Sequence, residues 1–151
     1  MKIIITSGYF DPVHVGHIEY LKLAKALGDK LIVILNSDAQ CILKKGNSFM
    51  LQNERKIILE SLKYVDEVFD SIDNEKFIDE NGRKHVPISN SIKAIAKKYK
   101  GKEIIYAKGG DRYAYEIPET PICKELGIKI IDGLGAKIQS SSNLTGIKEI
   151  K

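Results

Sequence analysis

Two histidines, separated by one valine and one glycine, are the residues of this chain best suited to chemistry. They lie in segment 8–17 (GYFDPVHVGH), where an isoleucine-rich run gives way to a turn with glycine and proline. His14 and His17 are three residues apart, so in a helix both imidazoles share one face. The first turn of a helix adds free backbone N–H groups and the positive end of the helix dipole. The segment therefore predicts an anion site with imidazole donors, which suits a triphosphate.

Two other interpretations of the histidine pair remain open. The residues could be polar groups at a helix N-terminus, one of them serving as a cap. They could also bind zinc, but a zinc site takes three or four ligands. The third histidine, His85, is distant in sequence, and Cys41 and Cys123 show no CxxC or Cys/His spacing. We therefore predict that the chain ligates no metal and that both cysteines are free thiols.

The elements that must position these residues alternate between strands and helices. Short apolar runs predict strands over 2–7, 31–35, 65–69, 103–107 and 128–131. Helical spacing of apolar residues predicts helices over 18–27, 53–62, 89–99, 118–126 and 142–150. Strand–helix–strand units place their strands parallel. The pattern predicts one α/β domain over residues 1–151, a Rossmann-like three-layer α/β/α fold with a mainly parallel sheet.

The predicted sheet also indicates where a ligand binds. In such sheets ligands lie beyond the carboxyl ends of the strands. The segments that follow strands are 8–17, 36–45, 108–112 and 137–143. Segment 70–87 interrupts the alternation; it is polar, contains the turn pair Asn81-Gly82, and predicts a loop or a hairpin insertion.

Composition excludes several classes of protein. The net charge of +4 with scattered lysines suits phosphate handling but is only weak evidence for nucleic-acid binding, and we expect no nucleic-acid partner. No apolar run reaches the roughly 18 residues of a membrane span, and the N-terminal apolar run is too short for a signal peptide. We therefore expect a cytoplasmic protein with no membrane contact. The turn after the first strand lacks a GxGxxG pattern, which argues against nicotinamide or flavin binding.

Segment 8–17 resembles the signature of the cytidylyltransferase-like nucleotidyltransferase superfamily, an HxGH motif after the first strand. The resemblance continues through 28–33 (GDKLIV), 36–38 (NSD), 55–60 (RKIILE), 64–68 (YVDEV), 108–111 (KGGD) and 140–143 (SSSN). Residues 55–68 look like glycerol-3-phosphate cytidylyltransferases. Residues 36–39 and 108–111 look more like the adenylyltransferase domain of bifunctional heptose-phosphate enzymes.

The resemblance implies an enzyme that transfers CMP or AMP from CTP or ATP to a phosphorylated polyol or sugar. An oxygen of the acceptor phosphate attacks the α-phosphorus, and pyrophosphate leaves without a covalent enzyme intermediate. Catalysis of this kind is mainly positioning and charge stabilisation. Mg²⁺ is expected on the triphosphate, without a dedicated protein cage. The family also implies a homodimer. A heptose-phosphate-type adenylyltransferase that uses ATP and a non-catalytic nucleotide-binding regulatory module are the alternatives.

The same resemblance assigns site residues. The predicted catalytic residues are His14, His17 and Lys44. The predicted nucleotide-binding residues are Gly8, Tyr9, Phe10, His14, Gly16, His17, Lys108, Gly109, Asp111, Ser140, Ser141 and Ser142. The predicted substrate-binding residues are Asp11, Lys45, Arg55 and Arg112.

Several of these residues have a structural alternative. Lys44 and Lys45 could belong to a solvated loop, and Arg55 could be an ordinary exposed helical residue. Asp11 could form a turn beside Pro12; its functional interpretation is to orient the loop or an acceptor hydroxyl. Cytidylyltransferases carry an arginine shortly before the serine run, which this chain lacks between 128 and 140, and Lys137 is the candidate substitute.

Overall fold

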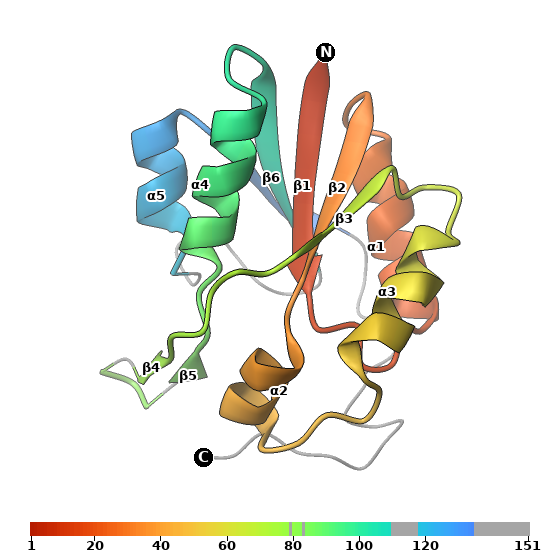
Figure 1. Ribbon diagram of the computed structural model, residues 1–151. Coiled ribbons are helices and arrows are strands. Elements are labelled where there is room, and N and C mark those ends of the chain that lie inside the picture. The colour runs from red at the N-terminus through yellow and green to blue at the C-terminus, as the bar shows by residue number, and fades with distance from the viewer. Residues whose placement is uncertain (79, 83, 110–117, 135–151) are drawn as a thin grey trace.

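Five strands form a parallel sheet at the centre of the molecule (Figure 1). The computed structural model describes residues 1–78, 80–82, 84–109 and 118–134 of the 151-residue chain. The strands are β1 (Lys2–Gly8), β2 (Lys30–Leu35), β3 (Glu67–Asp70), β6 (Glu103–Gly109) and β7 (Lys129–Leu134). Each neighbouring pair in the order β3-β2-β1-β6-β7 is parallel, which confirms the predicted sheet.

The chain builds this sheet outward from β1 in both directions. β2 and β3 are added on one side of β1, and β6 and β7 are then added on the other side. The strand order therefore reverses between β1 and β6. Open α/β sheets bind ligands in the crevice beyond the carboxyl ends of the strands at such a reversal.

Helices cover both faces of the sheet (Figure 1). One face carries α1 (Val15–Lys25) and α3 (Gln52–Glu60), and the other carries α4 (Ser89–Lys98) and α5 (Thr120–Leu126). Alternate side chains of a strand enter different cores: Ile3 and Ile5 pack with α4 and α5, whereas Ile4 packs with α1 and α3. Because both faces are buried, the central strands β1 and β2 contain continuous apolar runs, Ile3–Ile5 and Leu31–Leu35. The arrangement confirms the predicted three layers.

Helix α2 (Asp38–Lys45) was not expected from hydrophobic periodicity, and its signals are at its ends. In a capping box, Ser37 Oγ accepts a hydrogen bond from the Gln40 backbone N–H at 3.1 Å, and Gln40 Oε1 accepts one from the Ser37 N–H at 3.0 Å. Gly46 ends the helix with a φ of 80°, in the left-handed region that favours glycine.

The polar insertion after β3 contains a hairpin. β4 (Phe77–Ile78) pairs antiparallel with β5 (Lys84–His85), and Gly82 in the turn has a φ of 78°. The structure therefore selects the hairpin from the two predicted alternatives. The final helix predicted over 142–150 lies outside the described residues.

Both cysteines are free and buried, as predicted. Burial raises the pKa of both thiols, that of Cys123 to about 12, so neither is a thiolate at neutral pH. Within the described part of the chain, no helix has the length and apolar character needed to cross a membrane.

Replacing Leu21 of α1 tests the core on the α1 side of the sheet. Leu21 has no exposed surface, so Leu21→Ala is expected to lower the free energy of unfolding by about 2–5 kcal/mol, through lost burial and the cavity left behind. Urea unfolding followed by circular dichroism measures the change. Ile57→Ala on α3 is the control, because Ile57 is 65% exposed and its loss is expected to cost about 0.5 kcal/mol or less. Equal losses would contradict the placement of Leu21.

Candidate active site

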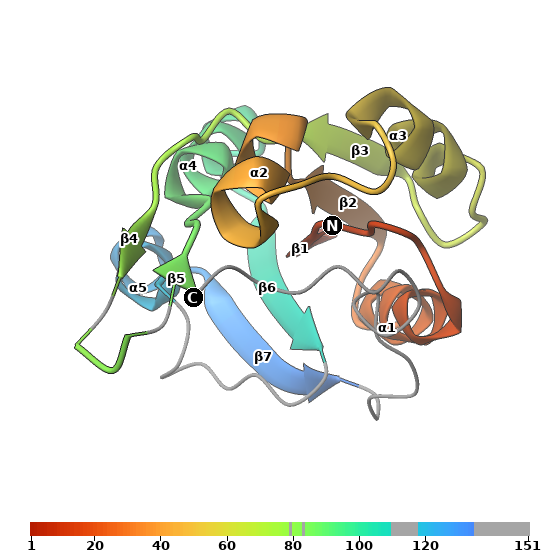
Figure 2. The ribbon, with the colours of Figure 1, turned by 90° about the horizontal axis from the view of Figure 1, so that it is seen from below.

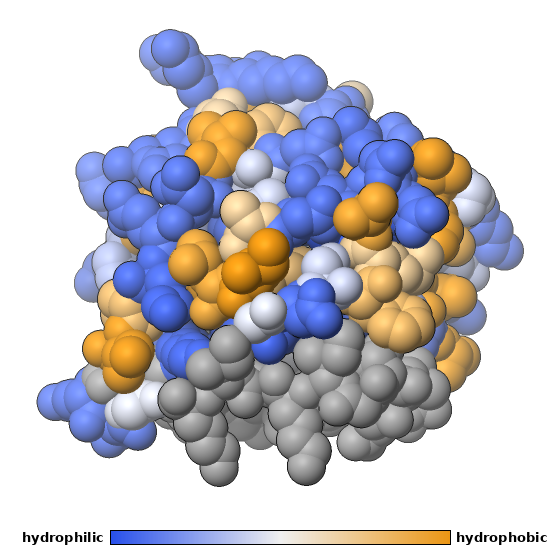
Figure 3. Space-filling view, turned by 60° about the horizontal axis from the view of Figure 1, so that its bottom comes forward, coloured by the Kyte–Doolittle hydropathy of each residue, from blue (hydrophilic) through white to orange (hydrophobic). Residues whose placement is uncertain are grey.

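The candidate site lies at the carboxyl ends of β1 and β2, where loops distant in sequence come together. Figure 2 looks onto this end of the sheet, with α2 and the hairpin β4–β5 beside it. Figure 3 brings the same end forward and shows a hydrophilic surface interrupted by apolar groups. Ile42, Phe49 and Leu51, from α2 and the loop after it, are among the exposed apolar side chains of the molecule.

His14 and His17 cap the first turn of α1 with their imidazole rings. His14 is the N-cap residue, and its Nδ1 accepts a hydrogen bond from the Gly16 backbone N–H at 3.1 Å. Nδ1 of His17 accepts one from the His14 backbone N–H at 3.2 Å. The rings stack with their centroids 3.8 Å apart. The structure thus places both imidazoles together at the positive end of the helix dipole.

These capping bonds decide which ring nitrogen carries the proton. An Nδ1 that accepts from a backbone N–H has no proton, so the neutral ring is protonated on Nε2, at its opposite edge. Burial, then the charges of His14 and Lys45, lowers the pKa of His17 to about 3, and burial also lowers the pKa of His14. The pair therefore offers neutral Nε2–H donors. The capping interpretation is confirmed, and it is compatible with anion binding because the caps use only Nδ1.

Phe10 supports His17 from the core. Its ring is 1% exposed and meets the His17 ring edge-on, with centroids 4.8 Å apart. Gly8 lies against the same ring, since a Cβ at position 8 would come within 3.0 Å of it. Phe10 and Gly8 were predicted to bind nucleotide. The structure gives the Phe10 side chain a supporting position and gives Gly8 a packing reason to lack a side chain.

Asp11 holds the loop between α2 and α3. Its carboxylate is 3% exposed and accepts hydrogen bonds from the backbone N–H groups of Phe49 at 2.8 Å and Met50 at 2.6 Å. Both carboxylate oxygens are therefore engaged with backbone. Of the two functional roles predicted for Asp11, this geometry supports orienting the loop.

Arg55 of α3 has no exposed surface and joins three loops. Nη1 donates to the carbonyl oxygens of Tyr9 at 2.7 Å and Asn36 at 2.8 Å, and Nε donates to that of Met50 at 3.0 Å. Nη2 forms an ion pair with Asp38 at 2.9 Å. Arg55 was predicted to bind substrate or to be exposed. A guanidinium with this burial and these partners instead positions the loops that follow β1, β2 and α2.

The two adjacent lysines at the end of α2 make different contacts. Lys45 Nζ lies 5.1 Å from the centroid of the Tyr9 ring, and the charge of Lys45 contributes to the lowered pKa of His17. Lys44 Nζ donates to the carbonyl oxygen of Lys84, in β5, at 2.7 Å. Lys45, predicted to bind substrate, is thus the lysine whose charge reaches the histidines. Lys44, predicted to be catalytic, links α2 to the hairpin.

β6 brings Lys108 and Gly109 to the same end of the sheet. Lys108 Nζ lies 3.5 Å from Ser7 Oγ of β1, and Ser7 Oγ shares a 2.7 Å hydrogen bond with the Tyr106 hydroxyl. A Cβ at Gly109 would come within 2.6 Å of the Tyr20 ring of α1, so the close approach of helix and strand requires glycine here.

Five of the predicted site residues lie outside the described part of the chain: Asp111, Arg112, Ser140, Ser141 and Ser142.

Some contacts at this end of the sheet had no signal in the sequence. Sequence reasoning missed Lys84 and His85 because nothing in the insertion links them to the strand ends. The sequence placed Asp38 directly after a strand, but it did not reveal the ion pair with Arg55, which lies 17 positions away.

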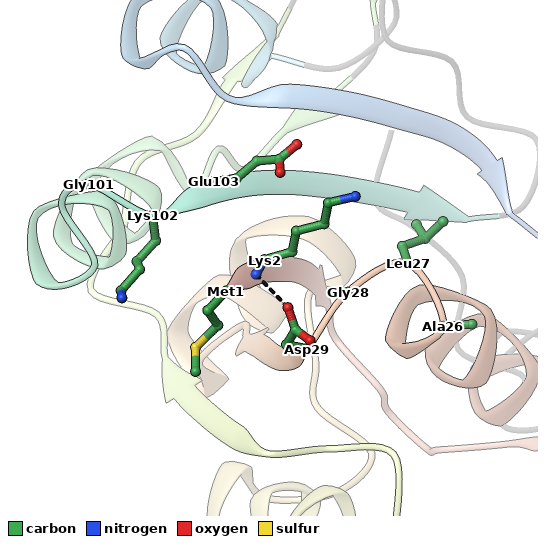
Figure 4. A pocket seen from close by; sticks show the side chains of 9 residues that line it. All are labelled: Met1, Lys2, Ala26, Leu27, Gly28, Asp29, Gly101, Lys102 and Glu103. Carbon is green, nitrogen blue, oxygen red and sulfur yellow. Dashed lines mark hydrogen bonds between the residues drawn. The ribbon is translucent and has the colours of Figure 1, made fainter.

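No group of three or more His, Cys, Asp or Glu side chains is placed to hold a metal ion among the residues that the structure describes. A hollow opens at the amino end of the sheet, beside the starts of β1 and β6 (Figure 4). Lys2, Asp29, Lys102 and Glu103 line it, and the Lys2 backbone N–H donates to Asp29 Oδ2 at 2.7 Å. Its charges are of both signs, so it shows no preference for an anion.

A parallel sheet that reverses its order between β1 and β6, with an imidazole pair capping the helix after β1, places the protein in the Rossmann-like α/β class. A match to a protein-family model then identifies the family. The chain belongs to the cytidylyltransferase-like family, whose model matches residues 5–127.

Its relatives include proteins of two kinds. Glycerol-3-phosphate cytidylyltransferase of Bacillus subtilis (strain 168) is 46% identical over 68 residues, which are 45% of this chain and 53% of that protein. Bifunctional protein HldE of Campylobacter concisus (strain 13826) is 36% identical over 153 aligned positions, which are 99% of this chain and 27% of that protein. The chain thus matches about half the length of the first and about a quarter of the second.

A solved structure supports the fold. The lipopolysaccharide core biosynthesis protein of Thermoplasma volcanium GSS1 superposes with a TM-score of 0.60 at 24% sequence identity. The match covers 86% of this chain and 93% of that chain. It supports the Rossmann-like arrangement of the sheet and its helices.

Removing the Arg55 guanidinium tests its positioning role. Arg55→Ala is expected to lower the free energy of unfolding by about 3–5 kcal/mol, because three carbonyl groups lose their donor and Asp38 loses its partner. Guanidinium chloride unfolding measures the loss. Lys56→Ala is the neighbouring control, since its ion pair with Asp70 is about two-fifths exposed or less and a pair so open to solvent is worth about 0–1 kcal/mol. A loss at Arg55 as small as that at Lys56 would show that the buried network is not stabilising.

The protonation of His17 can be followed by NMR. Its folded-state pKa of about 3 lies below the value of about 6.5 for an unfolded chain, so its imidazole shifts are expected to stay constant from about pH 8 to pH 5. Below about pH 6.5 the unfolded chain binds a proton that the folded state does not. The His17 contribution to the free energy of unfolding therefore falls as the pH decreases from about 6.5 towards 3. His17→Gln should lose this contribution, and a folded-state midpoint near 6.5 would refute the assignment.

Proposed function

We propose that this protein transfers CMP or AMP from a nucleoside triphosphate to a phosphorylated polyol or sugar and releases pyrophosphate. The imidazole pair carries the proposal: both Nδ1 atoms are engaged by backbone, which leaves the Nε2–H groups on the ring edges that face away from those bonds. Helix α1 has no acidic residue in its first turn, so no carboxylate there opposes an anion. Membership of the cytidylyltransferase-like family supports the same reaction.

The reaction needs donors and cations rather than a protein base. An oxygen of the acceptor phosphate bonds to the α-phosphorus while the bond from that phosphorus to the oxygen bridging the β-phosphate breaks. Pyrophosphate leaves with the electron pair of the broken bond. A phosphate monoester has a second pKa of about 6 and is largely dianionic at neutral pH, so no base has to activate it. Neutral imidazoles are suited to this task, since they donate hydrogen bonds to phosphate oxygens as charge shifts in the transition state.

The other predicted residues supply charge and order around the phosphates. Lys45 provides a cation beside the imidazole pair, and Arg55 and Asp11 hold the loops in place. Asp111, Arg112, Ser140, Ser141 and Ser142 keep the nucleotide- and acceptor-binding roles predicted for them. Mg²⁺ would neutralise charge on the triphosphate when bound. Mg²⁺ usually keeps several waters and binds through the phosphates of a substrate, so it needs few ligands from a protein.

The nucleotide is CTP or ATP, and the relatives support each choice differently. The 46% identity to a protein named glycerol-3-phosphate cytidylyltransferase favours CTP and a polyol phosphate, but it covers 45% of this chain. Similarity to HldE proteins extends over nearly the whole chain and favours ATP and a heptose phosphate. We keep the cytoplasmic location expected from the sequence, and we expect a homodimer from the family resemblance.

A rate measurement with His17→Ala tests the proposal. Pyrophosphate release is measured with CTP or ATP, Mg²⁺, and either glycerol 3-phosphate or a heptose phosphate. His17→Ala is expected to lower kcat by about 10²–10³-fold, the usual loss when a transition-state donor is removed. Val15→Ala, in the same turn and 57% exposed, is expected to keep wild-type rates.

Two results would count against the proposal. A folded His17→Ala variant with near wild-type rates would remove the imidazole from the mechanism. Tight calorimetric binding of CTP or ATP without pyrophosphate release for any acceptor would favour the regulatory module.

A further inference from the structure

A pocket lined by lysines opens at the reversal of strand order. Ser7 of β1 and Lys108 of β6 line it from the sheet, while Lys44 of α2 and Lys84 and His85 of the hairpin line it from the loops. Alternation along the strands places Ser7 and Lys108 on the face that carries α4 and α5. The imidazole pair belongs to α1, on the other face. The pocket is therefore a separate subsite beside the end of β1.

Among the described residues that line this pocket, lysines outnumber acidic side chains. Three lysines line it, against one acidic side chain among the described residues, that of Glu119. Lys84 is 9% exposed and His85 is 8% exposed, so the hairpin side is largely withdrawn from water. Attraction between cation and anion is stronger where water is excluded. This composition favours a compact anionic group, and lysine is a common phosphate ligand.

Contacts among the lining residues hold these groups in place. The bond from Lys44 Nζ to the Lys84 carbonyl oxygen at 2.7 Å ties α2 to the hairpin. The His85 ring stacks on Phe77 of the opposite strand, with centroids 4.9 Å apart. Lys108 Nζ is 3.5 Å from the hydroxyl of Ser7. These contacts join α2 to the hairpin, the two strands of the hairpin to each other, and β6 to β1.

The pocket and the imidazole pair share one stretch of backbone. Gly8 and Tyr9 line the pocket, and the chain continues directly to the His14 cap. Lys45 lies over the Tyr9 ring, and its charge lowers the pKa of His17. Two anions bound on the two sides of this segment would therefore meet at the end of β1.

We propose that this pocket binds the phosphate monoester of the acceptor, and that the hairpin selects the acceptor through Lys84 and His85. The inference rests on the proposed nucleotidyl transfer. The triphosphate occupies the imidazole side, and the acceptor phosphate occupies the lysine side. The acceptor oxygen then forms its bond to the α-phosphorus across the end of β1 as the bond to the pyrophosphate oxygen breaks, and no proton has to move.

Equilibrium binding and turnover together test this proposal with the full chain. Inorganic phosphate is titrated into the nucleotide-free protein by calorimetry, which requires no turnover. Lys84→Gln is expected to weaken phosphate binding about tenfold, and Lys84→Arg, which keeps the charge, should bind within threefold of the wild type. Lys102→Gln, at the opposite end of the sheet, is the control that should bind as the wild type does. Circular dichroism establishes that each variant is folded.

Steady-state kinetics distinguishes the acceptor from the nucleotide. With the acceptor that the wild type uses, Lys84→Gln should raise the KM for the acceptor about tenfold and leave the KM for the nucleotide within twofold. A raised KM for the nucleotide alone, or phosphate binding unchanged in a folded Lys84→Gln variant, would overturn the proposal. Absence of turnover in the wild type would refute the proposed function instead, while the phosphate titration would still decide the role of the pocket.

Discussion

The guanidinium of Arg55 reaches loops from three parts of the chain, and the shape of the carboxyl end of the sheet depends on it. Three backbone carbonyl groups and the Asp38 carboxylate accept its hydrogen bonds. Asp11 adds a second connection, from the loop after β1 to the loop after α2. Loops that follow parallel strands have no ladder hydrogen bonds of their own, so they need partners of this kind to keep a fixed shape.

The imidazole rings of the two histidines serve both structure and chemistry. The imidazoles of His14 and His17 replace a Ser- or Asp-type cap, and each uses one nitrogen for it. The second nitrogen is then necessarily the protonated one. Burial keeps the rings neutral, which makes them hydrogen-bond donors of fixed tautomer rather than titrating bases at neutral pH. A carboxylate cap would have placed negative charge where an anion is expected.

The reversal of strand order gives the site two sides. The α1 side carries the imidazoles, and the α4 side carries the lysine pocket with the hairpin at its edge. The segment after β1 separates them, and Arg55 holds it through the Tyr9 carbonyl. For the proposed nucleotidyl transfer, this division would let each anion be neutralised by its own donors before the two approach each other.

The sequence by itself determined the parallel sheet and the imidazole pair, because apolar periodicity and helix-terminal spacing are local properties. It also contained the end signals of α2, in Ser37, Gln40 and Gly46, although periodicity did not reveal that helix. Only the tertiary structure decided that Arg55 is buried, that Lys45 rather than Lys44 acts on His17, and that the hairpin reaches the strand ends. These contacts join residues 17 to 46 positions apart. The packing of the layers sets such distances, and no local pattern records them.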